Sequence, residues 1–223
     1  METLVNMRLH RRNFQKLALA LALPAPLALA ALGGRSAGIV LAQSTEPADT
    51  PLLAPTPVCG DDDDLIATLP QTAGPFFTPD TPERRSLLES GMPGTRLVVS
   101  GYVYSTGCQP IPGALLDFWQ ADDAGVYDNQ GYRLRGHQFA DEEGRFELET
   151  IVPGLYPGRT RHIHVIAQAG RPEGHPPILI TQLYFPEEPA NASDAIFNPA
   201  LVMDVQEAED GEAAFFNFAL SLG

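Results

Sequence analysis

The chain has 223 residues, 44% hydrophobic and 19% charged, a composition that suits one globular domain with extensions. Its formal net charge of −14 disfavours binding to nucleic acid or to anionic lipid, both of which are negatively charged. We therefore expect no nucleic-acid partner, and we look for function in a small site rather than in a charged surface.

Residues 1–42 are interpreted as an export signal outside the fold. The twin arginine Arg11-Arg12 precedes an apolar run over residues 17–32, which Gly33-Gly34 interrupts before it is long enough to span a membrane comfortably. Candidate cleavage sites end at Ala30 and at Ala42, and we favour the second because it leaves a polar terminus. The segment resembles a twin-arginine signal, so we expect a periplasmic or extracellular protein with no membrane association after its removal.

Residues 43–70 are predicted to be a linker. They are rich in Pro, Ala and Thr and end in the acidic run Asp61–Asp64. A solvated tether is favoured over a calcium site, because no glycine-turned loop with a distal glutamate follows the run.

Removal of residues 1–42 takes away five basic residues and one acidic residue. It would leave 9 basic against 27 acidic residues, a net charge of −18, with no lysine.

The chain has two cysteines, Cys59 in the linker and Cys108 in a turn of the domain. In an exported protein this pair suggests one disulfide, which would pin the tether to the domain. Two unpaired thiols are the alternative, and the geometry that decides between them is not contained in the sequence.

Residues 71–223 are predicted to form one domain, which opens at Gly74-Pro75-Phe76-Phe77. Thr81 is expected to cap a short helix over residues 82–90. Alternating or clustered apolar residues between Gly- and Pro-containing turns predict strands over residues 96–104, 113–119, 145–152, 162–168, 177–185 and 213–222. Short strands with little helix predict an all-β fold, an antiparallel β-sandwich with its site on strand ends and loops.

The stretch Leu155–Val165 concentrates the residues with chemistry. In a strand, His162 and His164 lie on one face, and two neutral imidazoles there can hold a metal ion. A merely polar strand face is the plainer alternative. Tyr156, in the preceding turn, and Tyr127, after an earlier strand, add phenolate oxygens, which suit hard trivalent iron better than zinc or copper(I). These four ligands would leave a coordination position open.

A series of motifs in one order resembles the intradiol ring-cleavage dioxygenases, non-haem iron(III) enzymes that include catechol 1,2-dioxygenase and protocatechuate 3,4-dioxygenase. The motifs are C-x-P-I-P-G-A-x-x-D-x-W-x-A-D-x-x-G-x-Y, D-x-x-G-R-F, I-V-P-G-x-Y, R-x-x-H-I-H and T-Q-x-x-F. The resemblance covers about residues 71–190, and the short loop Y-P-G-R-T-R-H-I-H is similar to that of the exported branch.

The resemblance implies four iron(III) ligands: Tyr127, Tyr156, His162 and His164. It also places Arg159 and Gln182 beside a bound aromatic diol. The implied reaction uses O₂ to open a catechol-type ring between its two hydroxylated carbons, giving a muconate-type diacid. Tyr156 would act as ligand and then as base, and Arg159 would stabilise negative charge on the ring.

Several residues have competing interpretations. Tyr132 competes with Tyr127 as a ligand, and Arg161 competes with Arg159 for the site; the family motifs favour Tyr127 and Arg159. The other two histidines of the domain match no ligand position and are expected at the surface or behind the ligands; they are His137 and His175.

The sequence also departs from the family. Gln120 stands where members often have histidine, and the N-terminal helical region of the catechol enzymes, which supplies their dimer contact, is absent. Family members are commonly oligomeric, so a homo-oligomer remains open.

Three functions are compared. The first is an exported intradiol dioxygenase. The second is a non-catalytic module of the same fold that binds iron or an aromatic ligand. The third is a carbohydrate-binding or adhesion sandwich, which would need no metal and gives no reason for two tyrosines beside the histidine pair.

Overall fold

The computed structural model describes residues 65–170 and 178–222, which all belong to the second of two units of the chain, Asp49–Gly223. The predicted export signal, most of the linker and His175 lie outside the described residues, so export and localisation stay predictions. Within the described residues, no helix has the length and apolarity needed to cross a membrane.

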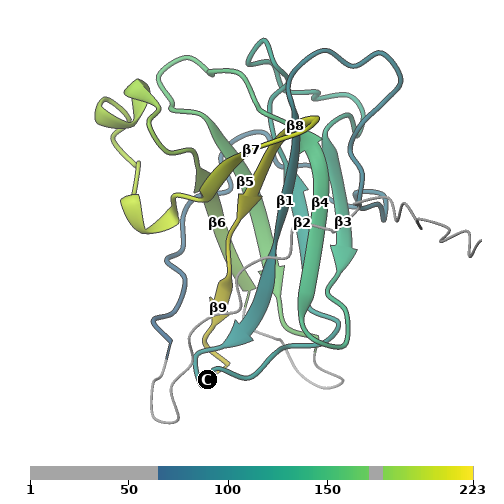
Figure 1. Ribbon diagram of the computed structural model, residues 1–223, viewed down its shortest axis with the longest axis vertical. Helices are drawn as coiled ribbons and strands as arrows, with labels where there is room; N and C mark the ends of the chain where they lie inside the picture. The colour runs from purple at the N-terminus through teal and green to yellow at the C-terminus, as the bar shows by residue number, and fades with distance from the viewer. Residues whose placement is uncertain (1–64, 171–177, 223) are drawn as a thin grey trace, which may run out of the picture. The chain divides into compact units, whose positions relative to one another are not determined.

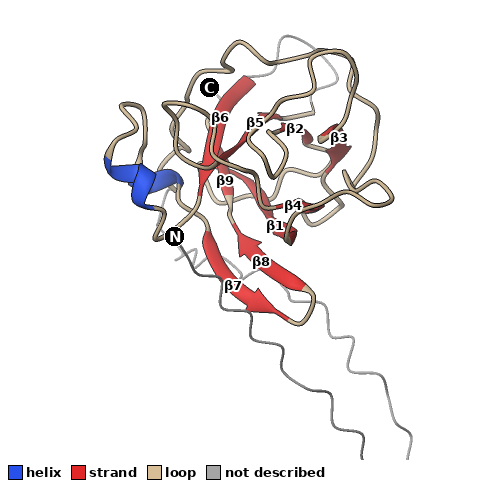
Figure 2. Ribbon diagram, turned by 90° about the horizontal axis from the view of Figure 1, so that it is seen from above, coloured by secondary structure: helices blue, strands red, loops and turns tan. Residues whose placement is uncertain are grey.

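Two sheets pack face to face in the described residues and confirm the predicted all-β sandwich (Figure 1). The strands are β1 (Arg96–Ser105), β2 (Leu115–Trp119), β3 (Arg135–Phe139), β4 (Arg145–Ile151), β5 (His162–Gln168), β6 (Ile178–Tyr184), β7 (Asp204–Ala208), β8 (Gly211–Phe215) and β9 (Phe218–Leu220). The helical elements of the described residues are two short 3-10 turns, η1 (Pro189–Ala192) and η2 (Pro199–Leu201), and η2 packs on β6. Helical ribbon is blue in Figure 2.

The strand order is β4-β1-β8-β7 in one sheet, with β9 also paired to β1, and β3-β2-β5-β6 in the other. The second sheet is antiparallel throughout, as predicted. In the first, β8 and β9 both run parallel to β1. The predicted strand over residues 213–222 is divided between them at Phe216-Asn217. There the Asn217 side chain accepts a hydrogen bond from the Tyr102 N–H (2.9 Å) and interrupts the ladder.

Strand β5 shows how the core positions the histidines. Ile163, Val165 and Ala167 are fully buried between the two sheets. Because side chains alternate along a strand, His162 and His164 lie on the opposite face, turned away from that core. This alternation is the one that the sequence predicts.

The predicted helix over residues 82–90 is wrong. The segment is extended and lies along the edges of two strands, with bridges from Glu83 to His137 and from Ser86 to Glu149. Its backbone bonds include Arg84 N–H to the His137 carbonyl and Leu87 N–H to the Glu149 carbonyl, both 2.8 Å. These long-range pairings satisfy backbone groups that a helix would pair locally, and they allow Leu87 to be buried completely.

The last linker residues are bound to the domain. The Leu65 N–H donates to the Thr106 carbonyl (2.7 Å), and the Thr68 N–H donates to the Ala219 carbonyl of β9 (2.9 Å). Cys108 is disulfide-bonded. Cys59, its predicted partner and the only other cysteine of the chain, lies outside the described residues.

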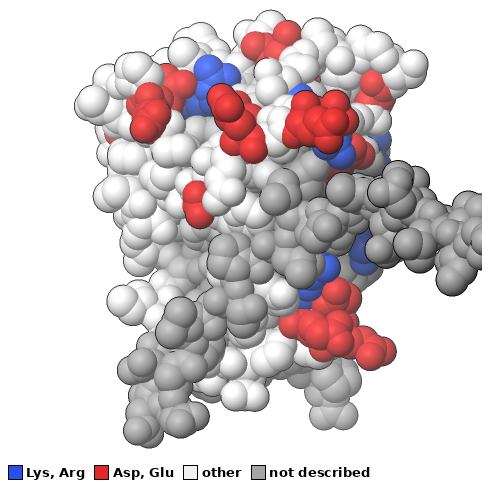
Figure 3. Space-filling model, in the orientation of Figure 1, with Lys and Arg blue, Asp and Glu red and all other residues white. Residues whose placement is uncertain are grey.

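Acidic side chains outnumber basic ones on the face shown in Figure 3, in keeping with the net charge of −14. Several arginines of the described residues form ion pairs with acidic side chains. Arg96 lies 2.7 Å from Glu149, and Arg145 lies 3.6 Å from Glu147. Such exposed pairs contribute little to stability, typically about 0–1 kcal/mol each.

Leu87→Ala tests the role of the extended segment. We expect a loss of about 2–5 kcal/mol in the free energy of unfolding, because a fully buried leucine leaves a cavity when truncated. Urea denaturation measures the change, and Leu88→Ala is the matched control, since Leu88 is only partly buried. Equal losses in the two variants would contradict this account.

Candidate metal centre

The site is built on the ends of three neighbouring strands. His164 pairs with Trp119 on β2 and with Gln182 on β6, and paired residues on adjacent strands point to the same face. The Trp119 ring stacks on the His164 imidazole, with centroids 4.8 Å apart and planes 5° apart. His164 is therefore fixed by its own strand and by the flanking strand β2.

The two histidines converge through their Nε2 atoms, which are 3.2 Å apart. The His162 Nδ1–H donates to the Thr160 carbonyl (2.5 Å), so its Nε2 carries the lone pair that a metal ligand needs. Burial lowers the pKa of His162 to about 4. Burial also holds the pKa of His164 well below its usual range, and the neighbouring His162 lowers it further. Both imidazoles are consequently neutral at pH 7.

The two predicted tyrosine ligands come from different loops. Tyr127, from the loop after β2, is buried and places its hydroxyl 3.3 Å from His162 Nε2. Phe76 stacks on its ring at 4.5 Å. Tyr156, from the loop before β5, is only half-buried and lies edge-on to Tyr127 at 6.0 Å between ring centroids. Burial raises the pKa of Tyr127, and the positive charges of Arg159 and then Arg135 act against that rise.

These donors fit a metal ion. The Nε2 atoms of His162 and His164 are 3.2 Å apart, close enough for both to bind one ion. Among the described residues, no group of three or more histidine, cysteine, aspartate or glutamate side chains could hold a metal. A centre here therefore depends on tyrosine oxygens, which favour a hard ion such as iron(III) over zinc.

Arg159 and Gln182 lie together at the edge of this centre. Arg159 donates to the Gln182 side-chain oxygen (2.5 Å) and, through Nε, to Asp194 Oδ2 (2.9 Å). The same Asp194 oxygen accepts the Thr160 N–H at 2.9 Å. Burial tends to raise the pKa of Asp194, but these donors outweigh it and the pKa lies below the ordinary value. The aspartate thus anchors both Arg159 and Thr160, the residue whose carbonyl orients His162.

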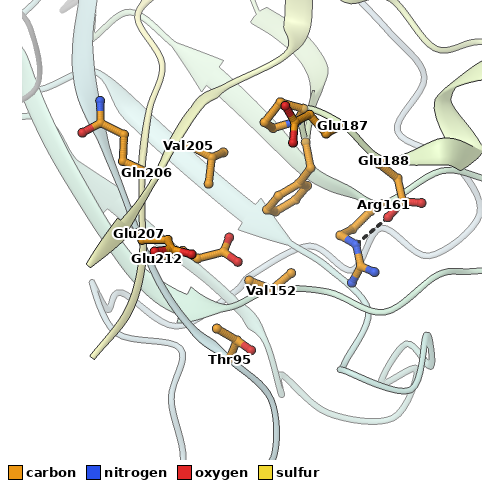
Figure 4. Close-up of a pocket in the computed structure, with 11 residues that line it drawn as sticks. Thr95, Val152, Arg161, Glu187, Glu188, Val205, Gln206, Glu207 and Glu212 are labelled. Atoms are coloured by element: carbon orange, nitrogen blue, oxygen red, sulfur yellow. Dashed lines mark hydrogen bonds and ion pairs between the residues drawn. The ribbon is translucent and has the colours of Figure 1, made fainter. Parts of the chain in front are cut away.

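Arg161 lies elsewhere. Its Nε donates to Glu188 (3.0 Å), at the rim of a cavity of about 470 Å³ (Figure 4). The cavity is otherwise lined by Thr95, Val152, Phe185, Pro186, Glu187, Val205, Gln206, Glu207 and Glu212. Of the two candidate arginines, only Arg159 is hydrogen-bonded to Gln182, and none of the four predicted ligands lines this cavity.

Three other residues considered in the sequence have hydrogen-bond partners other than the histidine pair. The Tyr132 hydroxyl donates to the Pro79 carbonyl (3.2 Å), and Tyr132 is 39% exposed. His137 contacts the Thr81 carbonyl through Nδ1 (2.8 Å). Gln120 is buried, where its side chain donates to the Ile151 carbonyl (2.9 Å).

The sequence patterns do not single out Trp119, Phe76 or Asp194 as site residues. Trp119 ends a predicted strand and stands in the family motif D-x-W-x-A-D, and these two features are the signals that could have found it. Asp194 follows η1 in an irregular segment, and its approach to Arg159 depends on how that segment folds.

The loops that carry the tyrosines meet backbone to backbone. The Gly154 N–H donates to the Asp122 carbonyl (2.7 Å). Gly125 has φ +80°, and a Cβ there would lie 2.1 Å from the Leu155 carbonyl oxygen. Only glycine permits both this conformation and this approach. The contact sets the spacing between the segments that carry Tyr127 and Tyr156.

Comparison with known proteins identifies the family. The family profile described as Dioxygenase matches residues 72–222. The chain is 31% identical over 170 residues to hydroxyquinol 1,2-dioxygenase of a Rhizobium species, covering 63% of this chain and 56% of that protein. It is 32% identical over 165 residues to the protocatechuate 3,4-dioxygenase beta chain of Burkholderia cepacia, covering 62% of this chain and 69% of that one.

A solved structure of a dioxygenase domain is also similar to this chain. It is the dioxygenase domain of a dioxygenase–carbohydrate-binding protein fusion from Streptomyces sp. SirexAA-E, 55% identical to this chain with a TM-score of 0.67. The match covers 71% of this chain and 100% of that domain. This chain therefore belongs to the intradiol ring-cleavage dioxygenase family, whose members typically use non-haem iron(III). It spans little more than half the length of the Rhizobium relative.

Gly125→Ala tests the contact between the tyrosine loops. We expect weaker iron binding and a loss of stability above the roughly 1–2 kcal/mol that a left-handed alanine costs, because the new Cβ forces the loops apart. Iron titration and urea denaturation measure the two effects.

Gly113→Ala is the matched control. Gly113 has a similar φ of +65°, but a Cβ there meets nothing within 4 Å. If the two variants bind iron equally well, the loop contact does not position the site.

Proposed function

We propose that this chain is a non-haem iron(III) dioxygenase that cleaves the ring of a catechol-type diol between its two hydroxylated carbons. The observation that carries the proposal is the convergence of His162 Nε2, His164 Nε2 and the Tyr127 hydroxyl, with Tyr156 alongside. Both atoms of O₂ would end in the muconate-type product, so no external reductant is needed. Bound iron(III) would supply the electron-accepting centre that chelates the diol.

The two tyrosines are suited to different tasks. Tyr127 is buried, stacked on Phe76 and held near His162, which favours a permanent ligand. Tyr156 is half-buried and is followed by the exposed pair Pro157-Gly158, so its side chain has room to turn. Tyr156 would therefore be the ligand that gives way to a diol oxygen and accepts the diol proton at its phenolate oxygen.

Arg159 would stabilise the charge that develops on the diol. Asp194 and Gln182 hold its guanidinium on two sides, which fixes its direction before substrate arrives. A cation fixed in this way stabilises a forming anion without the cost of reorientation. Arg159 remains partly exposed, with 18% of its side chain accessible, so a ligand can reach it.

The proposed entrance for the diol lies between Tyr156 and the η1 region. A cavity of about 460 Å³ is lined there by Leu155, Tyr156, Pro157, Gly158, Arg159, Ala190 and Ser193. Its lining combines apolar side chains with the Arg159 cation, which suits an aromatic ring that carries ionisable hydroxyls. The relatives named for hydroxyquinol and protocatechuate support this substrate class.

The first test is a visible absorption spectrum of the iron-loaded protein, recorded before and after anaerobic addition of catechol. We expect a broad tyrosinate-to-iron charge-transfer band that moves to longer wavelength when the diol chelates the metal. Oxygen uptake and product analysis across a panel of diols then measure cleavage.

Tyr127→Phe should weaken the band and iron binding, because it removes a hard anionic donor. Tyr132→Phe is the matched control and should leave both unchanged, since Tyr132 bonds to Pro79 away from the histidines. A coloured protein that cleaves no diol would favour a non-catalytic iron-binding module. A protein that stays colourless after iron loading would overturn the ligand set and the enzyme assignment.

A further inference from the structure

Arg135, at the start of β3, is a buried cation to which the proposed reaction assigns no role. Its side chain is completely buried, with 0% exposure. Burying a charged group without a charged partner costs several kcal/mol in general, so such a residue calls for a compensating interaction. The residues around its guanidinium connect Arg135 to Tyr127, one of the proposed metal ligands.

The guanidinium binds backbone oxygens on both sides of Tyr127. Nε and one terminal nitrogen donate to the Asp128 carbonyl, at 3.0 and 2.7 Å. The other terminal nitrogen donates to the Phe76 carbonyl at 2.6 Å. Asp128 follows Tyr127 in sequence, and Phe76 stacks on the Tyr127 ring. One side chain therefore fixes the peptide that carries the tyrosine and the segment that packs on it.

Arg135 has no ion-pair partner among residues 65–170 and 178–222. The nearby Asp128 carboxylate is turned into its own loop, where it accepts the N–H groups of Gln130, Gly131 and Arg133. Asp117 is hydrogen-bonded to Thr81 instead. Within those residues, Arg135 is therefore held by backbone carbonyl oxygens, those of Asp128 and Phe76, rather than by a carboxylate.

The chain around Arg135 is held in an unusual conformation. Leu134 has φ +54°, a left-handed value that is rare for a bulky residue and costs of order 1–3 kcal/mol. Arg84 donates from Nε to the Arg135 carbonyl at 2.9 Å and so holds the other side of the same residue. This backbone directs the Arg135 side chain into the protein, despite the cost of the left-handed residue before it and the cost of burying a cation.

We propose that Arg135 is a positioning residue of the metal centre, which holds Tyr127 in place through the Asp128 and Phe76 carbonyls. It does not contact the metal or the substrate. The inference rests on the proposed iron–tyrosinate centre. Groups that orient a metal ligand from behind in this way typically change metal affinity by about 10–100-fold when they are removed.

The test compares Arg135→Gln, Arg135→Lys and the control Arg133→Gln with the wild-type protein. Arg133 lies two residues away, but it is partly exposed and pairs with Asp122 at 3.4 Å. Iron affinity, charge-transfer absorbance per bound iron and melting temperature are measured for each protein. A role confined to stability would lower the melting temperature without changing the absorbance per iron.

We expect Arg135→Gln to bind iron about 10–100-fold more weakly than the wild type, with lower absorbance per bound iron. The iron affinity of Arg135→Lys should lie between those of Arg135→Gln and the wild type. Lysine keeps the positive charge but lacks the forked guanidinium that bridges both carbonyls. Arg133→Gln should match the wild type.

A folded Arg135→Gln variant with wild-type affinity and absorbance would overturn the inference. If that variant does not fold, wild-type iron affinity in Arg135→Lys would overturn it instead. A wild-type protein without the band would refute the proposed function itself, which distinguishes the two failures.

Discussion

The strict alternation of β5 is the constraint on which the site depends. Ile163, Val165 and Ala167 fill the core between the sheets, and their burial fixes the register of the strand. A slip of one residue would turn the two imidazoles into the apolar core between the sheets and turn the three apolar side chains toward the site face. The free energy that holds the sandwich together therefore also holds the two nitrogen donors side by side.

The oxygen donors are positioned by contacts between loops rather than by the alternation of a strand. Tyr127 and Tyr156 come from loops, whose backbones meet at Gly125 and Gly154. Arg135 fixes the first loop from inside, and Asp194 fixes Arg159 and the peptide before His162. The centre thus combines two histidines on one strand, β5, with two tyrosines on loops. Backbone contacts and a buried arginine position those loops, and sites that combine strands and loops are common on β-scaffolds.

Local patterns in the sequence predicted the sandwich, most of its strands and the shared face of the two histidines. They failed where distant segments decide the structure. Residues 82–90 pair with the edges of β3 and β4 rather than forming a helix. The polar sequence of β3, R-G-H-Q-F, shows no strand pattern, and its conformation comes from pairing with β2. Asp194 reaches Arg159 across an irregular segment, which no periodicity describes.

The stack of Trp119 on His164 has a spectroscopic consequence. Trp119 is the only tryptophan of the chain, and its ring lies 4.8 Å from the imidazole. Its fluorescence therefore arises from one place, next to a nitrogen of the candidate centre. A paramagnetic ion bound there would quench that emission by contact-range electron and energy transfer. The protein thus contains an intrinsic optical reporter of metal occupancy, which needs neither turnover nor a visible chromophore.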